Sequence, residues 1–266
     1  MEERASPAFG PVTRFHPVLA VVVPVRNEEL NILPLIREIE TALQSLAFEI
    51  VYVDDGSDDA TGLRLREAKR SARSLRVLRH RRSSGQSAAI LSGVKAATAD
   101  WIATLDGDGQ NDPADIPALF QRALALDAEC AAGVGPVLIT GERRRRMDSW
   151  GKRMSSRIAN TLRARLLRDG TPDTGCGLKV FRKDAFLALP HFDHMHRFLP
   201  ALFIRAGGSV VSVPVAHRPR LRGRSNYGTL DRLWVGLADL AGVFWLQRRR
   251  IRAEPEDATI EPAPPR

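Results

Sequence analysis

Short apolar runs alternate with helix-length segments over about the first hundred residues, and this alternation constrains the fold more than any other feature. The runs are rich in valine, isoleucine and leucine, as in strands that are buried on both faces. The segments between them repeat apolar residues every three or four positions, as amphipathic helices do. Strands are expected at Leu19–Val25, Ile50–Val53, Leu75–Leu78 and Trp101–Leu105, and helices at Glu28–Ala47, Ala60–Arg73 and Gly85–Thr98. The pattern predicts an α/β fold with a mostly parallel central sheet flanked by helices.

The second half of the chain is more basic and less regular. Further strands are expected at Leu178–Phe181 and Ser209–Val215, and helices at Ser149–Arg168, Phe198–Ala206 and Thr229–Arg250. Two basic stretches, Arg143–Arg146 and His217–Arg224, lie between these elements. The chain is therefore expected to consist of a flexible N-terminal segment (1–17), one domain (18–228), an amphipathic helix (229–252) and a disordered tail (253–266).

The charge of the chain favours an anionic partner. Forty Lys and Arg residues against 31 Asp and Glu give a net charge of +9, which suits nucleic acid, a phosphate-bearing substrate or an acidic lipid surface. Aromatic residues make up only 6% of the chain and do not interleave with the arginine runs, so nucleic acid is disfavoured. Two cysteines, Cys130 and Cys176, exclude a disulfide framework, and Cys176 is expected to be a small buried thiol. No secretory signal or apolar membrane-spanning run is visible.

Acidic residues follow two of the predicted strands. Asp54 and Asp55 end the second strand, and Asp106 and Asp108 follow the fourth. Because ligands of parallel α/β sheets bind beyond the carboxyl ends of the strands, these residues mark a candidate site. Asp106, Asp108 and Gln110 alternate along a glycine-rich loop and supply the oxygen ligands that Mg²⁺ or Mn²⁺ prefers. The alternative is a solvated turn.

Two further polar segments open predicted helices. Pro24, Arg26 and Glu28 follow the first strand, and Gly85 and Gln86 precede the third helix. Free backbone N–H groups at a helix start attract anions, although ordinary helix capping explains such residues equally well. Neither a Walker-type phosphate loop nor a G-x-G-x-x-G fingerprint is present, which argues against a P-loop ATPase or an NAD-dependent dehydrogenase.

The ordered set of motifs resembles a known family. PVRNE, VDDGSDD, SSGQSAAILSGVKAA, DGDGQNDP, GERRRRMDSWGKRMSSRIAN, DTGCGLKVFRK and RLRGRSNYG are similar to segments of the family 2 glycosyltransferases, which have the GT-A fold. Within that family, they resemble the dolichol-phosphate mannosyltransferase and undecaprenyl-phosphate glycosyltransferase branch. The resemblance covers about residues 18–250 and implies an inverting, metal-dependent hexosyltransferase that uses a nucleotide-sugar donor with UDP or GDP.

The resemblance also implies roles for individual residues. The expected nucleotide-sugar site comprises Pro24, Arg26, Glu28, Asp54, Asp55, Gly85, Gln86, Asp106, Gly107, Asp108, Arg143, Arg220 and Ser225. Mg²⁺ or Mn²⁺ would bind to Asp106, Asp108 and Gln110. Gly141, Arg143 and Arg146 match a G-x-R-x-x-R pattern, and the acceptor phosphate would meet Arg146, Arg153 and Ser156. The catalytic residues are expected to be Asp108, Arg146 and Arg153. One departure is Asn226, where lysine is common, which bears on donor affinity.

The acceptor is expected to be a polyprenyl phosphate. A sugar hydroxyl needs a carboxylate base to deprotonate it, whereas a lipid phosphate is already anionic and needs cations. The Glu-Asp pair and Q-x-x-R-W segment of polysaccharide-forming relatives are absent, and the corresponding stretch is PHFDHMHRFLP. Asp173 is a candidate orienting group, although a turn residue is the simpler explanation. The alternatives are a hydroxyl-directed transferase of the same fold and a catalytically silent scaffold.

The C-terminal helix suggests a membrane surface as a partner. Members of this branch often carry C-terminal membrane helices, but the last segment here is amphipathic. Its apolar residues would meet the bilayer interface, and its terminal arginines would meet anionic headgroups. These residues are Leu230, Leu233, Leu237, Leu240, Phe244, Trp245 and Arg248–Arg250. The expected location is cytoplasmic, on the inner face of the membrane, with a small membrane protein or a second copy as a further partner. The alternative is a helix that packs on its own domain.

Overall fold

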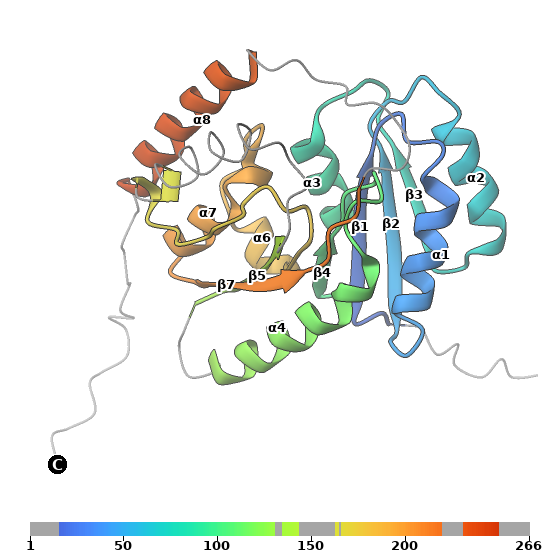
Figure 1. The fold of residues 1–266 in the computed structure, drawn as a ribbon, viewed down its shortest axis with the longest axis horizontal. Helices are drawn as coiled ribbons and strands as arrows, with labels where there is room; N and C mark the ends of the chain where they lie inside the picture. Colours follow the sequence, from blue (N-terminus) through green and yellow to red (C-terminus); the bar gives the residue numbers. More distant parts are fainter. Residues whose placement is uncertain (1–15, 131–134, 144–162, 165, 220–230, 250–266) are drawn as a thin grey trace, which may run out of the picture.

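A computed structural model describes residues 16–130, 135–143, 163–164, 166–219 and 231–249 of the chain. In this part of the chain the strands form one seven-stranded sheet in the order β3-β2-β1-β4-β6-β5-β7 (Figure 1). The strands are β1 (Leu19–Val25), β2 (Phe48–Asp54), β3 (Leu75–Arg79), β4 (Trp101–Thr104), β5 (Val137–Arg143), β6 (Lys179–Arg182) and β7 (Ser209–Val215). Only β6 runs antiparallel to its neighbours β4 and β5. The predicted α/β class with a mostly parallel sheet is therefore confirmed.

Helices cover both faces of the sheet (Figure 1). The described helices are α1 (Ile32–Ala42), α2 (Thr61–Ser71), α3 (Gln86–Ala96), α4 (Ile116–Cys130), α6 (Lys183–Leu187), α7 (Leu199–Arg205) and α8 (Asp231–Gln247), with short 3₁₀ turns at Pro113–Asp115 and Met195–Arg197. Leu19, Val21 and Val23 pack with α1, α2 and α4. Ala20 and Val22 point the other way and pack with α3, α6 and α7. The two-sided burial explains why β1 is a continuous apolar run.

The observed elements differ from the predicted ones mainly at helix starts and in the second half. The first helix begins at Ile32 rather than Glu28, because backbone groups of residues 27–29 bind side chains of the loop after β2. Strand β5 and helix α4 were not predicted, although β5 contains the apolar run Val137–Ile139 and α4 buries Ile116, Leu119, Phe120 and Ala123. Residues 163, 164, 166 and 167 are helical, as expected for the end of the predicted helix 149–168, and the rest of that helix lies outside the described residues.

Helix α8 packs against the domain. Val243 is 1% exposed and contacts a small cluster with Leu167, Phe198 and Ala201. Arg205 Nε donates to the Leu246 carbonyl at 2.9 Å, which joins α7 to the end of α8. On the same helix Leu237 is 45% exposed and Trp245 60% exposed. Within the described residues, no helix combines the length and the apolar character needed to cross a bilayer.

Candidate active site

The loops after β1 and β2 are joined by reciprocal hydrogen bonds. Asn27 N donates to Ser57 Oγ at 3.0 Å, and Asp58 N donates back to Asn27 Oδ1 at 3.1 Å. Glu28 N donates to Thr61 Oγ1 at 2.9 Å, and Glu28 itself is buried. Because β1 and β2 are parallel neighbours, both loops leave the sheet at the same edge. The residues of PVRNE and DDGSDDAT therefore form one rigid frame, from which the Arg26 side chain extends into solvent.

Asp54 and Asp55 both bind groups of the protein. Asp54 accepts from Ser57 N at 2.9 Å and lies 3.4 Å from Arg79 Nε. The Asp55 carboxylate accepts hydrogen bonds from four groups of the segment between β3 and α3. These are His80 Nδ1 (2.6 Å), Ser83 Oγ (2.8 Å), Ser84 N (2.8 Å) and Gly85 N (2.9 Å). Asp55 thus fixes the loop that carries Gly85 and Gln86 into the site.

The hydrogen bonds of Asp55 outweigh the effect of its burial. Burial alone would raise the pKa of Asp55, but the bonds from Ser84, His80, Ser83 and Gly85 lower it below its ordinary value of 3.8. A carboxyl group whose pKa is lower in the folded state stabilises the fold above its unfolded pKa. This contribution is lost as the pH falls through the lowered folded value.

Asp55→Asn is therefore expected to destabilise the protein by about 2 kcal/mol at neutral pH, because an amide cannot accept all four hydrogen bonds. Urea unfolding of the wild type and the variant at a series of pH values measures the difference. The difference should be constant above about pH 5 and shrink below about pH 4. Asp58→Asn, in an exposed acid of the neighbouring loop, should change stability little. A loss of stability in Asp55→Asn that does not vary with pH would contradict the lowered pKa of Asp55.

The Asp106–Gln110 loop begins directly after β4. Gln86 Nε2 donates to Asp106 Oδ1 at 2.9 Å, and Gln110 N donates to Asp108 Oδ1 at 3.1 Å. A β-carbon on Gly107 would lie 2.3 Å from Val25 Cγ1, so only glycine fits here. Gly177 approaches Asp106 as closely, because a β-carbon there would lie 2.2 Å from its carboxyl group. The Asp106 carboxylate is thus held between the start of α3 and the segment before β6.

The site carries crowded negative charge. Burial, and then the nearby Asp108, raise the pKa of Asp106 to about 6, while Lys179, Arg143 and the Gln86 hydrogen bond oppose the rise. Two carboxylates that repel each other favour a cation between them, and an amide oxygen at Gln110 extends the oxygen set. Among the described residues no cluster of three or more His, Cys, Asp or Glu side chains is placed for a metal. Two carboxylates and an amide oxygen are the kind of donors that Mg²⁺ or Mn²⁺ accepts when substrate or water supplies its other ligands.

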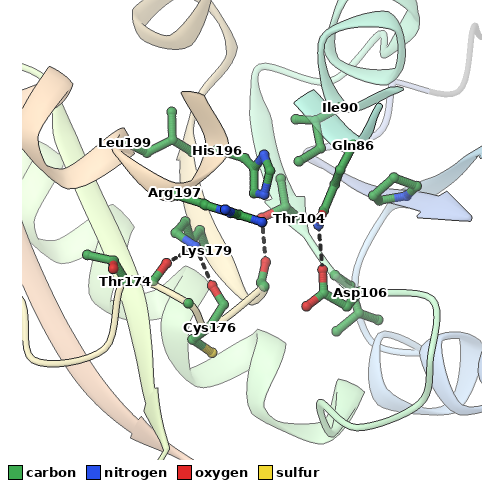
Figure 2. A pocket seen from close by; sticks show the side chains of 14 residues that line it. Gln86, Ile90, Thr104, Asp106, Thr174, Cys176, Lys179, His196, Arg197 and Leu199 are labelled. Atoms are coloured by element: carbon green, nitrogen blue, oxygen red, sulfur yellow. Dashed lines mark hydrogen bonds between the residues drawn. The ribbon is translucent and has the colours of Figure 1, made fainter. Parts of the chain in front are cut away.

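A pocket of about 370 Å³ opens beside Asp106 (Figure 2). Of the residues predicted to bind the nucleotide sugar, Pro24, Gln86 and Asp106 line it. The other described members of that set do not, namely Arg26, Glu28, Asp54, Asp55, Gly85, Gly107, Asp108 and Arg143. The remaining walls are formed by Ile90, Thr104, Leu105, Thr174, Gly175, Cys176, Gly177, Lys179, His196, Arg197 and Leu199. The second half of the chain thus supplies most of the residues that line the pocket, and the first half supplies the others.

Lys179 enters the pocket because β6 runs antiparallel to β4. The pairing places Lys179, the first residue of β6, opposite Thr104, the last residue of β4. Lys179 is 4% exposed, and its Nζ donates to the carbonyl oxygens of Thr174 (3.3 Å) and Cys176. Burial lowers the pKa of Lys179, while Cys176 and Asp106 oppose this. Sequence reasoning did not assign this lysine a role, and its place in TGCGLK at the start of a predicted strand was the only signal.

His196 and Arg197 lie in the loop before α7. The His196 ring is held at 2.8 Å from Ser87 Oγ of α3. Burial, and then the charges of Arg197 and Lys179, lower the pKa of His196 to about 3, so the ring is neutral at physiological pH. No role was predicted for His196 from the sequence. His194, in the same loop, lies 3.0 Å from Asp239 of α8.

Arg143 is paired with Asp173. Arg143 Nε and one terminal nitrogen donate to the two Asp173 oxygens at 2.6 and 2.8 Å, and Arg143 N also reaches Asp173 at 3.3 Å. Burial alone would lower the pKa of Arg143, but the bonds and the charge of Asp173 raise it. Asp173 therefore orients Arg143 near the pocket. Gly141 and Arg143 lie in β5, while Arg146, Arg153, Ser156, Arg220, Ser225 and Asn226 lie outside the described residues.

The chain beyond β7 is attached to the Asp106–Gln110 loop. Arg218 N donates to the Gln110 carbonyl at 2.8 Å. The Arg218 guanidinium binds Asp112 at 2.6 Å and Glu38 of α1 at 2.7 Å. These contacts hold the carbonyl of a proposed metal-binding residue from a segment more than a hundred residues later in the chain. The described part of the second basic stretch thus borders the acidic loop.

Comparisons with solved structures identify the fold. Glucosyl-3-phosphoglycerate synthase from Mycobacterium tuberculosis, in complex with Mn²⁺, UDP and glucosyl-3-phosphoglycerate, matches with a TM-score of 0.61. The identity is 18%, and the match covers 92% of this chain and 86% of that one. The same enzyme with Mg²⁺ and UDP gives a TM-score of 0.63 at 18% identity, covering 87% and 79% of the two chains. The predicted GT-A arrangement is confirmed.

Sequence comparisons identify the family. Dodecaprenyl-phosphate galacturonate synthase from Rhizobium johnstonii is 33% identical over 240 residues, which cover 88% of this chain and 68% of that protein. Undecaprenyl-phosphate 4-deoxy-4-formamido-L-arabinose transferase from Edwardsiella ictaluri is 34% identical over 216 residues, covering 80% and 63%. The chain thus spans about two thirds of the length of these relatives. The model of glycosyl transferase family 2 matches residues 20–189, and the chain belongs to this family.

Proposed function

We propose that the protein transfers a sugar from a nucleotide-sugar donor to a polyprenyl phosphate, with inversion at the anomeric carbon. The proposal rests on which acidic and basic side chains line the pocket. Among the described residues that line it, Asp106 is the only carboxylic acid, and it belongs to the proposed metal site. His196 is a poor base because its pKa is lowered to about 3. Among these described residues a hydroxyl acceptor would find no free base, whereas a phosphate acceptor is already ionised.

The names of the two sequence relatives support this acceptor. One is a dodecaprenyl-phosphate galacturonate synthase and the other an undecaprenyl-phosphate sugar transferase. The structural neighbours were crystallised with UDP and Mn²⁺ or Mg²⁺, which supports a nucleotide donor and a divalent ion here. The two names differ in the length of the lipid and in the sugar, so the element they share is the polyprenyl phosphate.

Each part of the site has a proposed role. Asp106, Asp108 and Gln110 would hold Mg²⁺ or Mn²⁺, which offsets the charge of the donor diphosphate when bound. Pro24, Arg26 and Glu28, with the frame fixed by Asp54 and Asp55, would hold the nucleoside. Gly85, Gln86, Gly107 and Arg143, with Arg220 and Ser225 beyond the described residues, complete the donor site. Arg146, Arg153 and Ser156 would contact the acceptor phosphate. Arg146 and Arg153, with Asp108, remain the proposed catalytic residues.

Incubation with radiolabelled UDP- and GDP-sugars and undecaprenyl phosphate tests the proposal. Label should enter a chloroform-soluble product that mild acid hydrolyses, because a sugar linked to a polyprenyl phosphate is acid-labile. Undecaprenol, which lacks the phosphate, serves as the control acceptor and should remain unlabelled. Label that stays in the aqueous phase on a glycan would instead identify a hydroxyl-directed enzyme.

The outer face of α8 is a proposed contact with the membrane surface that holds the acceptor. Leu237 and Trp245 are exposed there while Val243 packs inward. The guanidinium of Arg248 lies 4.0 Å from the centre of the Phe244 ring, and that of Arg249 lies 5.8 Å from Trp245. Aromatic and basic groups side by side suit the boundary between acyl chains and anionic headgroups. The proposed location is therefore the cytoplasmic face of the membrane.

The double substitution Leu237→Ser and Trp245→Ser should weaken binding to vesicles of anionic phospholipid about tenfold or more, because two interfacial anchors are lost. Co-sedimentation with phosphatidylglycerol vesicles measures the binding. Leu63→Ser and Leu124→Ser, at exposed leucines of α2 and α4, provide a control that should bind as the wild type does. Equal loss in both double variants would show that this face of α8 has no special role.

A further inference from the structure

Lys179 has an unusual environment for a buried cation. It is 4% exposed, and within the described residues its ammonium group donates to two backbone carbonyls. Among the described residues no carboxylate lies within ion-pair distance of its ammonium group. The charges of Asp106 and Asp173 favour the charged form of Lys179 only from beyond ion-pair distance, and a buried ammonium group without a direct counter-ion is costly unless it binds an anion. The ammonium group carries three N–H donors, and it borders the pocket.

Arg197 brings a second cation to the same pocket. Within the described part of the chain its guanidinium makes no hydrogen bond or ion pair, although its neighbours on both sides are held firmly. His196 is bound to Ser87, and Phe198 is buried. Figure 2 shows Arg197 extending from the side of Lys179 toward Gln86 and Asp106. A guanidinium presents a fork of donors that matches phosphate oxygens.

The two cations face the proposed metal site across the pocket. Asp106 and Gln86 form one wall, and Lys179 and Arg197 belong to the segments from β6 to α7 on the other side (Figure 2). A donor diphosphate held through a divalent ion at Asp106 and Asp108 would have this pocket beside it for its sugar. In an inverting displacement the nucleophile attacks the anomeric carbon from the side opposite the leaving group. The cations therefore lie where an attacking anion would approach.

We infer that Lys179 and Arg197 bind the phosphate of the acceptor lipid and present one of its oxygens to the donor sugar. The inference rests on the proposed function. A bond forms between a phosphate oxygen and the anomeric carbon, and the bond between that carbon and the diphosphate oxygen breaks. The electron pair leaves with the nucleoside diphosphate, and no proton transfer is needed because the acceptor is already ionised. The neutral His196 contributes no charge and holds its loop against α3.

Binding of farnesyl phosphate to the full chain, measured by calorimetry with Mg²⁺ present, tests the inference independently of turnover. Lys179→Met and Arg197→Gln should each weaken binding at least tenfold, because each removes a charge-assisted contact. Lys179→Arg should restore most of the affinity. The affinity for UDP or GDP with Mg²⁺ should change less than twofold in every variant. Farnesol, which lacks the phosphate, should bind the wild type and the variants equally weakly.

Two matched controls separate this role from a general effect of removing a cation. Lys183, four residues after Lys179, donates to the Ala97 carbonyl outside the pocket, and Arg205 donates to Leu246. Lys183→Met and Arg205→Gln should bind farnesyl phosphate as the wild type does. Unchanged binding in Lys179→Met and Arg197→Gln would overturn the inference, as would an equal loss of nucleotide affinity. Farnesyl phosphate binding that depends on both cations, without sugar transfer, would retain the inference and reject the proposed function.

Discussion

Asp106→Asn is expected to reduce sugar transfer on the order of a thousandfold while leaving the fold as stable as before or more stable. The asparagine oxygen can still accept the hydrogen bond from Gln86, so the local geometry survives. The substitution removes the charge that a divalent ion would bind, and with it the electrostatic stabilisation of the leaving diphosphate. It also removes the repulsion from Asp108 that helps raise the pKa of Asp106 to about 6.

The expected gain in stability of Asp106→Asn follows from the raised pKa of Asp106. A carboxyl group whose folded pKa lies above its unfolded value destabilises the fold whenever it is ionised. At pH 7 the amide should therefore add roughly 1 kcal/mol to the free energy of unfolding, after allowance for partial solvent exposure. The gain should vanish below about pH 4, where the acid is neutral in both states. Urea unfolding at both pH values measures the change in stability, and transfer assays with added Mn²⁺ measure the change in activity. Full activity in the variant would refute the metal site.

Asp173→Ala is expected to destabilise the protein by about 3 kcal/mol. Asp173 and Arg143 are both largely buried and share two short hydrogen bonds. Removing one partner of a buried pair leaves the other charge uncompensated, and this loss exceeds the net value of the pair. Thermal unfolding should show the change, and transfer should fall with it because Arg143 loses its fixed orientation.

The double variant Asp173→Ala with Arg143→Met separates stability from function. With both charges removed, most of the lost stability should return, since neither member of the pair is left buried without the other. If Arg143 contacts the donor diphosphate, transfer should stay low in the double variant. Recovery of both stability and transfer would assign Arg143 a purely structural role. Arg182, whose guanidinium is paired on the surface with Asp127 and Asp184, is a control whose loss should cost less than 1 kcal/mol.

The strands and site residues in the first half of the chain could be predicted because short continuous stretches of sequence encode them. Buried parallel strands appear as continuous apolar runs, and the residues that follow them gather at one edge of the sheet. Asp55 and Asp106 were identified in this way, and they are linked through the loop of Gly85 and Gln86. Their exact partners were not predictable, because the four groups bound to Asp55 lie 25 to 30 residues away.

The second half could not be predicted to the same extent, because its site depends on strand direction. An apolar run does not indicate whether β6 runs with or against β4, yet that choice decides which end of β6 meets the pocket. The antiparallel pairing of Thr104 with Lys179 brings the lysine to the site. The pairing of Arg143 with Asp173 likewise joins residues 30 positions apart, and local patterns do not encode such contacts.

Because β6 runs in the reverse direction, the segment before it can change in sequence independently of the loops after β1 and β2. The parallel strands β1, β2 and β4 reach the site at their ends, whereas β6 reaches it at its beginning. Residues 173–179 therefore enter the pocket from a connection of their own, without passing through the frame formed by the loops after β1 and β2. Apart from Asp173, which orients Arg143, and Gly177, which abuts Asp106, residues of this segment can change and alter what the pocket accepts while the loops after β1 and β2 stay in place. The fold thus offers a route to transferases with new acceptors built on the same first half of the chain.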